Sequence, residues 1–211
     1  MKPLCDCRLY TFVDTAYLQG RDPKEVAMQL CDGGSDLIQL RAKDCTANQI
    51  RHLADQILPV TLSAGVGLVI NDHLEIAREA GADLCHLGQE DFFDRGYSHV
   101  SQLERGANLQ VGLSTHAPAQ AQRAMTAAAD YIAIGPVYAT GTKPGARPVT
   151  LDYVRWAAGN VSVPWFAIGG INLKNIQAVL DAGAKNICVV SAILNAPNIS
   201  AACAEFRRRL A

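Results

Sequence analysis

A repeating pattern constrains this chain more than any other feature. Eight short apolar runs alternate with polar tips and alanine-rich amphipathic segments. Continuous apolar runs of this length are typical of parallel strands that are buried on both faces. The pattern therefore predicts eight parallel strands joined by helical crossovers, at Leu9–Val13, Leu37–Leu40, Gly67–Ile70, Leu84–Leu87, Gln110–Leu113, Tyr131–Ile134, Trp165–Ile168 and Ile187–Val190.

The segments between the runs have the composition and the boundaries of helices. Asp22 followed by Pro23 predicts a helix start, with the aspartate as N-cap and proline at the first helical position. Glycine-alanine pairs such as Gly81-Ala82 are expected where a helix ends and the chain turns into the next strand. We expect helices at Pro23–Cys31, Ala47–Leu58, Glu75–Ala80, Pro118–Ala128 and Leu173–Ala182.

Strand–helix–strand units with right-handed crossovers leave two main solutions, an open doubly wound sheet and a closed barrel. Eight units at nearly uniform spacing favour closure. No linker or low-complexity tract divides the 211 residues, a length near the lower limit of roughly 200 for such barrels. We therefore expect an α/β protein with one catalytic domain over residues 1–211, a single (β/α)₈ TIM barrel with short loops.

Charge and cysteine content narrow the class of protein. A formal net charge of −1 argues against a nucleic-acid or membrane-surface partner, and no apolar run approaches the roughly 20 residues that span a bilayer. Residues 1–6 lack the apolar core of a signal peptide. Seven cysteines without metal-site spacing are expected to be free thiols in the cytoplasm. Small-molecule substrates fit this composition, and a homo-oligomer stays open.

Cationic side chains follow the second run. In a TIM barrel the catalytic groups lie at the carboxyl ends of the strands. Because side chains alternate along a strand, Gln39, Arg41 and Lys43 should share one side, opposite Leu40 and Ala42. Two cations and an amide on one side suit a phosphate group. The alternative is a strand end that runs into solvent.

Acidic side chains follow the third and fourth runs. Asn71, Asp72 and Asp91 would come close together in a barrel, and they offer the hard oxygen ligands that Mg²⁺ prefers. The alternative is capping: Asp72 would cap the Glu75–Ala80 helix and Asp91 a loop. Facing the cations, they predict a site for one Mg²⁺ ion and a diphosphate.

A second anion site is expected at the seventh and eighth runs. Gly169 and Gly170 let backbone N–H groups approach a phosphate, and Ser191 adds a hydroxyl. The glycine-rich segment 135–145 is suited to closing over an anionic ligand, or it is an ordinary surface loop. Two anion sites, one for a diphosphate, indicate transfer of a carbon group between two phosphorylated substrates.

Two histidines, His86 and His116, are candidates for acid–base catalysis. We expect His86 in the upper layer of the barrel with hydrogen bonds, and His116 as a cap of the segment after Ser114. No activated serine or cysteine nucleophile is apparent. The enzyme would therefore work by stabilising a leaving group and aligning an acceptor.

From Leu9 to Ile193 the chain resembles the thiamine-phosphate synthase family. The resemblance depends on motifs whose order and spacing together are specific. These motifs are Gly20-Arg-Asp22, Gln39-Leu-Arg-Ala-Lys43, Ile70-Asn-Asp72, His86-Leu-Gly-Gln-Glu-Asp91, Gly112-Leu-Ser-Thr-His116, Gly135-Pro-Val-Tyr-Ala-Thr-Gly-Thr-Lys143, Ala167-Ile-Gly-Gly-Ile171 and Val190-Ser191.

The resemblance implies a transferase that joins hydroxymethylpyrimidine diphosphate to a thiazole phosphate, carboxylated or not, and forms thiamine phosphate and pyrophosphate by a dissociative, Mg²⁺-assisted mechanism. It implies Mg²⁺ ligation by Asp72 and Asp91, and catalytic roles for Arg41, Lys43, Ser114 and Lys143. The implied pyrimidine diphosphate site comprises Gln39, Leu40, Arg41, Ala42, Lys43, Asn71, Ser114 and Lys143. The implied thiazole phosphate site comprises Thr140, Gly141, Thr142, Gly170, Val190 and Ser191.

The chain departs from the family pattern at two points. Leu84-Cys85 replaces the usual Gly-Val, and Thr150 stands where the family often has glycine. Three rival functions stay open: a thiazole tautomerase, which needs neither metal nor diphosphate site, a sugar-phosphate isomerase or epimerase, and a degenerate barrel that senses a ligand. The intact set of Asp72, Asp91 and Lys143 favours the synthase.

Overall fold

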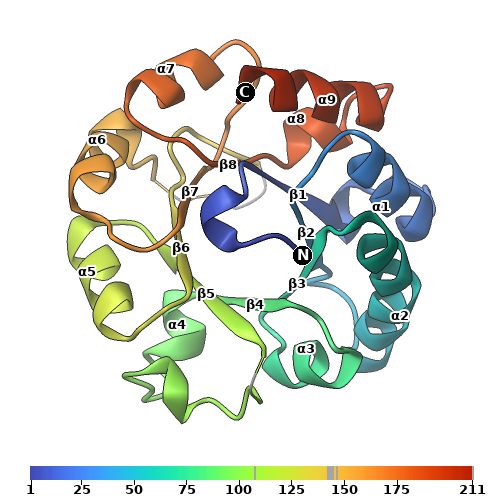
Figure 1. Ribbon diagram of the computed structural model, residues 1–211, viewed down its shortest axis with the longest axis horizontal. Helices are drawn as coiled ribbons and strands as arrows, with labels where there is room; N and C mark the ends of the chain where they lie inside the picture. Colours follow the sequence, from blue (N-terminus) through green and yellow to red (C-terminus); the bar gives the residue numbers. More distant parts are fainter. Residues whose placement is uncertain (107, 142–144, 146, 211) are drawn as a thin grey trace.

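The apolar runs form parallel strands that close into one barrel, in the order of the sequence (Figure 1). The computed structural model describes residues 1–106, 108–141, 145 and 147–210. Each strand pairs in parallel with the next, and β8 pairs with β1 to close the barrel. The predicted TIM barrel is confirmed, and the open sheet is wrong. The strands are β1 Leu9–Asp14, β2 Leu37–Arg41, β3 Gly67–Asn71, β4 Leu84–Leu87, β5 Gln110–Thr115, β6 Tyr131–Ile134, β7 Trp165–Ile168 and β8 Ile187–Cys188.

Helices surround the barrel and bury their apolar faces against it (Figure 1). Asp22 caps α1 as expected, because its side chain accepts hydrogen bonds from the backbone N–H groups of Lys24 and Glu25. In the described part of the chain, no helix is long and apolar enough to cross a membrane. The helices are α1 Pro23–Asp32, α2 Ala47–Ala64, α3 Leu74–Ala80, α4 Gln89–Phe92, α5 Pro118–Thr126, α6 Thr150–Asn160, α7 Ile176–Asp181, α8 Ser191–Leu194 and α9 Ile199–Arg209, with short 3₁₀ helices η1 Leu4–Asp6, η2 Thr15–Tyr17 and η3 Val100–Gln102.

Helix α2 extends beyond its predicted end at Leu58. Pro59 lies inside it, and the helix continues to Ala64 before Gly65 ends it in the left-handed region at a φ of 67°. Ile57 and Thr61, one turn apart, are both fully buried. Burial of this face offsets the hydrogen bond that proline removes from the helix.

The amino ends of the strands form the closed end of the barrel. The N-terminal segment with η1 lies across this end (Figure 1). Asp36 is the centre of its polar contacts: its carboxylate lies 2.6 Å from the Lys2 ammonium and 2.7 Å from the Arg207 guanidinium, and it also accepts hydrogen bonds from the backbone N–H groups of Arg8 and Leu9. One buried carboxylate therefore ties both ends of the described chain to the start of β2.

Aromatic rings fill the interior between the two ends. Tyr10, Tyr131 and Phe166 are buried and meet edge to face, with ring centroids 5.4–6.1 Å apart. Gly112 on β5 makes room for one of these rings, since a Cβ there would lie 2.0 Å from Cζ of Tyr131. The seven cysteines are all free thiols, as expected from their spacing.

Candidate active site

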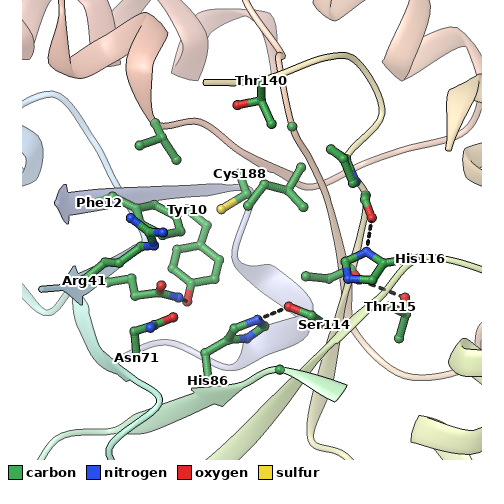
Figure 2. A pocket seen from close by; sticks show the side chains of 18 of the residues that line it. Tyr10, Phe12, Arg41, Asn71, His86, Ser114, Thr115, His116, Thr140 and Cys188 are labelled. Atoms are coloured by element: carbon green, nitrogen blue, oxygen red, sulfur yellow. Dashed lines mark hydrogen bonds between the residues drawn. The ribbon is translucent and has the colours of Figure 1, made fainter. Parts of the chain in front are cut away.

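A cavity of about 410 Å³ opens at the carboxyl ends of the strands, and all eight strands contribute to its lining. Figure 2 shows this cavity from close by. The predicted site residues that line it are Gln39, Arg41, Lys43, Asn71, Asp72, Asp91, Ser114, Thr140, Gly170, Val190 and Ser191. The structure thus brings residues from distant parts of the sequence to one place.

The cationic part of the cavity follows the predicted alternation along β2. Gln39 and Arg41 line the cavity together with Lys43, whereas Leu40 and Ala42 are buried and do not line it. Arg41 Nη1 lies 2.8 Å from Oδ2 of Asp14, and Lys43 forms an ion pair with Asp72. Both cations at the mouth are therefore held by carboxylates from neighbouring strands or the loops that follow them.

Asp72 does not cap the helix that follows it. The residue at the N-cap of α3 is His73, and no side chain caps that helix. Asp72 itself adopts a φ of 64°, and its Oδ2 accepts a hydrogen bond of 2.6 Å from Nδ2 of Asn71. The carboxylate thus lies among the polar groups of the cavity, and the helix-cap interpretation is wrong.

Asp91 lies in the first turn of α4 and lines the same cavity. One of its carboxylate oxygens is 3.6 Å from the guanidinium of Arg95. Among the described residues, no group of three or more histidine, cysteine, aspartate or glutamate side chains could enclose a metal ion. Two carboxylates are instead the kind of partial ligand set that Mg²⁺ uses while it keeps waters and binds phosphate oxygens.

The opposite side of the cavity is rich in backbone groups. Gly169 and Gly170 have φ values of 103° and 66°, and a Cβ on either would lie within 2.6 Å of Pro136 or Ala139. Only glycine fits this close approach between the end of β7 and the segment that follows β6. Val190 and Ser191 complete this side at the start of α8.

The predicted closing segment is described only in part. Thr140 lines the cavity, whereas Gly141 does not. Thr142 and Lys143 lie outside the described residues.

The floor of the cavity carries a chain of polar side chains, which includes His86. Nε2 of His86 lies 2.9 Å from Oγ of Ser114 (Figure 2), and its Nδ1 lies 2.9 Å from the hydroxyl of Tyr131. Burial lowers the pKa of His86 to about 4 from its ordinary 6.5. The expectation of a buried, hydrogen-bonded histidine is confirmed, and its ring also lines the cavity.

His116 differs from expectation. Ala117 is the N-cap of α5, and no side chain caps that helix. Nδ1 of His116 lies 2.5 Å from the carbonyl oxygen of Gly135 (Figure 2). The capping interpretation is wrong because the ring turns across to the end of β6 and lines the cavity.

Several lining residues were not identified from the sequence. Tyr10, Phe12 and Cys188 lie inside apolar runs, so they were assigned to the core. The period of two along a strand is the signal that could have found them, since it places Tyr10 and Phe12 on the same side as Asp14. These residues form the part of the barrel core on which the cavity rests.

The closed barrel, with cations, carboxylates and paired glycines around one cavity at its strand ends, defines a TIM-barrel enzyme that acts on phosphorylated small molecules. Residues 9–193 match the family described as thiamine monophosphate synthase. The chain belongs to this family, and it is accordingly a transferase of thiamine biosynthesis.

Individual relatives agree with this assignment. A thiamine-phosphate synthase of Lawsonia intracellularis is 40% identical over 206 residues, which cover 97% of this chain and 93% of the relative. One of Thermus thermophilus is 45% identical over 179 residues, which cover 84% of each chain. The structure of a thiamine phosphate pyrophosphorylase from Pyrococcus furiosus superposes with a TM-score of 0.87 at 27% identity, over 99% of this chain and 98% of the other.

Proposed function

We propose that the enzyme joins hydroxymethylpyrimidine diphosphate to a thiazole phosphate, carboxylated or not, and releases thiamine phosphate and pyrophosphate, with CO₂ also released when the thiazole is carboxylated. The observation that carries this proposal is the division of one cavity. Cations and carboxylates from β2 to α4 line one part, and the glycines and Ser191 after β7 and β8 line another. The first suits a diphosphate and the second a monophosphate.

In this proposal the leaving diphosphate binds between Arg41, Lys43 and Asn71, with Lys143 from the segment that follows Thr140. Arg41 offers a planar fork of donors, and the lysines offer point charges. Their attraction grows as negative charge builds on the leaving diphosphate, and in a dissociative reaction most of that charge has developed in the transition state. These cations would therefore act mainly on kcat.

One Mg²⁺ ion would be held by Asp72 and Asp91. Their carboxylates suit the ion chemically, and both line the cavity beside the cations. Bound there, the ion would add positive charge that stabilises the leaving diphosphate. Asp72 also pairs with Lys43 and accepts a hydrogen bond from Asn71, so its carboxylate is held in place at the mouth of the cavity.

Gln39 and Ser114 would hold the pyrimidine ring at the floor. The bond between the exocyclic methylene and the diphosphate oxygen breaks, and its electron pair leaves with pyrophosphate. The lone pair of the thiazole nitrogen then forms the new carbon–nitrogen bond. Thr140, Thr142, Gly170, Val190 and Ser191 would bind the thiazole phosphate and so align that nitrogen.

We also propose that residues 1–211 act as one catalytic domain in the cytoplasm. The strands extend from Leu9 to Cys188 around one barrel, and α9 packs on α1 after the last of them. The free thiols support a reducing compartment.

Incubation of the protein with both substrates and Mg²⁺ tests the proposed reaction. Thiamine phosphate and pyrophosphate should appear in equal amounts, by chromatography and a coupled phosphate assay, and neither should form when one substrate is omitted. Isomerisation of the thiazole phosphate alone, with no coupling, would instead assign the protein as a tautomerase.

A further inference from the structure

A continuous chain of hydrogen bonds runs under the cavity floor from Gln39 to Ser114. Nε2 of Gln39 donates to the hydroxyl of Tyr10 at 2.5 Å, and that hydroxyl lies 3.1 Å from the hydroxyl of Tyr131. Tyr131 meets Nδ1 of His86 at 2.9 Å, and Nε2 of His86 meets Oγ of Ser114 at 2.9 Å. Figure 2 shows Tyr10, His86 and Ser114 around the same floor, with the bond from His86 to Ser114 drawn.

The single proton of each hydroxyl gives this hydrogen-bond chain one direction. An imidazole whose Nδ1 accepts a hydrogen bond carries its proton at Nε2, and a phenol hydroxyl has one proton to donate. Since the amide nitrogen of Gln39 can only donate, Tyr10 donates to Tyr131 and Tyr131 donates to Nδ1. Nε2 then carries the proton and donates to Ser114.

The two ends of this hydrogen-bond chain, Gln39 and Ser114, therefore present an acceptor and a donor, respectively, to the cavity. Oγ of Ser114 already accepts from His86, so its own proton is available to a ligand. Oε1 of Gln39 is available as an acceptor. Among the described residues it has no hydrogen-bond partner, and Oγ of Ser114 has none besides His86. An aminopyrimidine presents an amino N–H beside a ring nitrogen, which complements one acceptor and one donor. A deaminated ring presents a carbonyl beside an N–H, which is the reverse.

We propose that Tyr10, Tyr131 and His86 are positioning residues that orient Gln39 as an acceptor and Ser114 as a donor, and so select an aminopyrimidine diphosphate over its oxo counterpart. This inference rests on the proposed function. The cations at the mouth would fix the diphosphate, so the ring could not slide to exchange its two edge groups.

The packing around the chain supports a fixed orientation. Tyr10 and Tyr131 are buried, at 1% and 0% exposed, and their rings meet edge to face. Reversal would require the amide, both hydroxyls and the imidazole proton to change together inside the core. A buried polar chain that stays fully paired resists such a change, because each unpaired group in it costs free energy.

Substrate selectivity tests the proposal. We expect the wild-type enzyme to favour the amino over the oxo pyrimidine diphosphate by at least roughly 10²-fold in kcat/KM. Tyr131→Phe and Tyr10→Phe each interrupt the chain, and each should lower this ratio by about 10-fold, by weakening the amino substrate and accepting the oxo substrate better. A merely structural defect would lower both rates alike and leave the ratio unchanged.

Tyr153→Phe is the matched control. It also removes a phenol hydroxyl from the interior, one that makes hydrogen-bond contacts with Thr115 and the carbonyl oxygen of Ala117 and with no member of the Gln39–Ser114 hydrogen-bond chain. Its amino-to-oxo ratio should equal that of the wild type. An unchanged ratio in both Tyr131→Phe and Tyr10→Phe overturns the proposal.

The ¹⁵N shifts of His86 in the unmodified enzyme give a second test that does not depend on the variants folding. Protonation at Nε2 is expected, and protonation at Nδ1 overturns the proposed direction of the chain. Failure of the wild type to couple either pyrimidine would refute the proposed function instead, and the histidine shifts would still decide the direction.

Discussion

Arg41 Nη1 lies 2.8 Å from Oδ2 of Asp14, so a cation at the mouth of the barrel is anchored to a carboxylate that is 1% exposed. Asp14 is the last residue of β1 and Arg41 the last of β2, and the two are paired in register. The orientation of the guanidinium is therefore set by the barrel, before any anion binds.

Asp14→Ala should lower the free energy of unfolding by about 3 kcal/mol, because it leaves a partly buried cation without this carboxylate. Added pyrophosphate should restore part of the loss by pairing with Arg41. Denaturation with and without pyrophosphate measures both effects. Asp152→Ala is the control, since it removes an exposed ion pair with Arg155 and should change little. Equal losses in the two variants would contradict a special role for Asp14.

Lys143→Ala should lower kcat by at least roughly 10²-fold, the effect of losing one group that stabilises charge in the transition state. Steady-state kinetics with both substrates measure it. Lys185→Ala removes an exposed lysine that precedes β8, at the opposite end of the barrel, and should leave kcat unchanged. A near wild-type kcat in Lys143→Ala would refute its assigned role.

Asp91→Asn should also lower kcat by at least roughly 10²-fold, and it should raise the Mg²⁺ concentration needed for half-maximal rate. The amide keeps the shape of the side chain and removes the charge that attracts the cation. Titration of the rate with Mg²⁺ measures both effects, and Asp94→Asn, at an exposed position three residues on, serves as the control. Unaltered Mg²⁺ dependence would show that Asp91 is not a ligand.

The free energy of unfolding should fall as the pH is lowered from about 6.5 toward 4, in part because of His86. Burial holds its folded-state pKa at about 4, below the unfolded value of 6.5. The neutral form stabilises the fold fully above the unfolded pKa, and this contribution is lost at lower pH because the unfolded chain binds the proton first. Denaturation across this range should show a shallower slope in His86→Gln. His52→Gln, at an exposed position on α2, should match the wild type, and identical slopes in all three would refute the prediction.

Thr150→Gly should raise the free energy of unfolding by about 0.5–1 kcal/mol. Thr150 adopts a φ of 63°, a left-handed conformation that is costly for a β-branched residue and free of strain for glycine. The left-handed φ fits the glycine that the family resemblance implies at this position. Chemical denaturation measures the gain. Thr150→Ala should gain less because alanine keeps its Cβ, and an equal gain would point away from backbone strain.

The barrel could be predicted because parallel strands buried on both faces leave an uninterrupted apolar signal. The runs beginning at Leu9 and Leu37 match β1 and β2 to within one residue at each end. Helix α9 was missed although Ile199, Cys203 and Phe206 recur at helical spacing and are buried. Three arginines end this helix and no strand follows it in the described part of the chain, so the segment does not show the helix-then-strand pattern from which the other helices were predicted.

The mouth of the cavity could be predicted because phosphate and metal sites need charged residues and glycines, and these stand out at the ends of apolar runs. The floor could not be predicted in the same way. Tyr10 and Tyr131 lie within apolar runs, and their hydroxyls gain a role only through contacts between strands far apart in the sequence. Such contacts depend on register around the closed barrel, which no local pattern specifies.

Gly112 gives way to the ring of Tyr131 so closely that even a methyl group there would displace it. The same atoms that fill the barrel core thus hold the hydrogen-bonding groups of the cavity floor. A mutation that repacks this core would alter which ring the enzyme accepts, whereas changes in the phosphate-binding loops leave the core intact. In this barrel we expect selectivity for the pyrimidine ring to change together with the packing of the core. Phosphate recognition can change independently of the core.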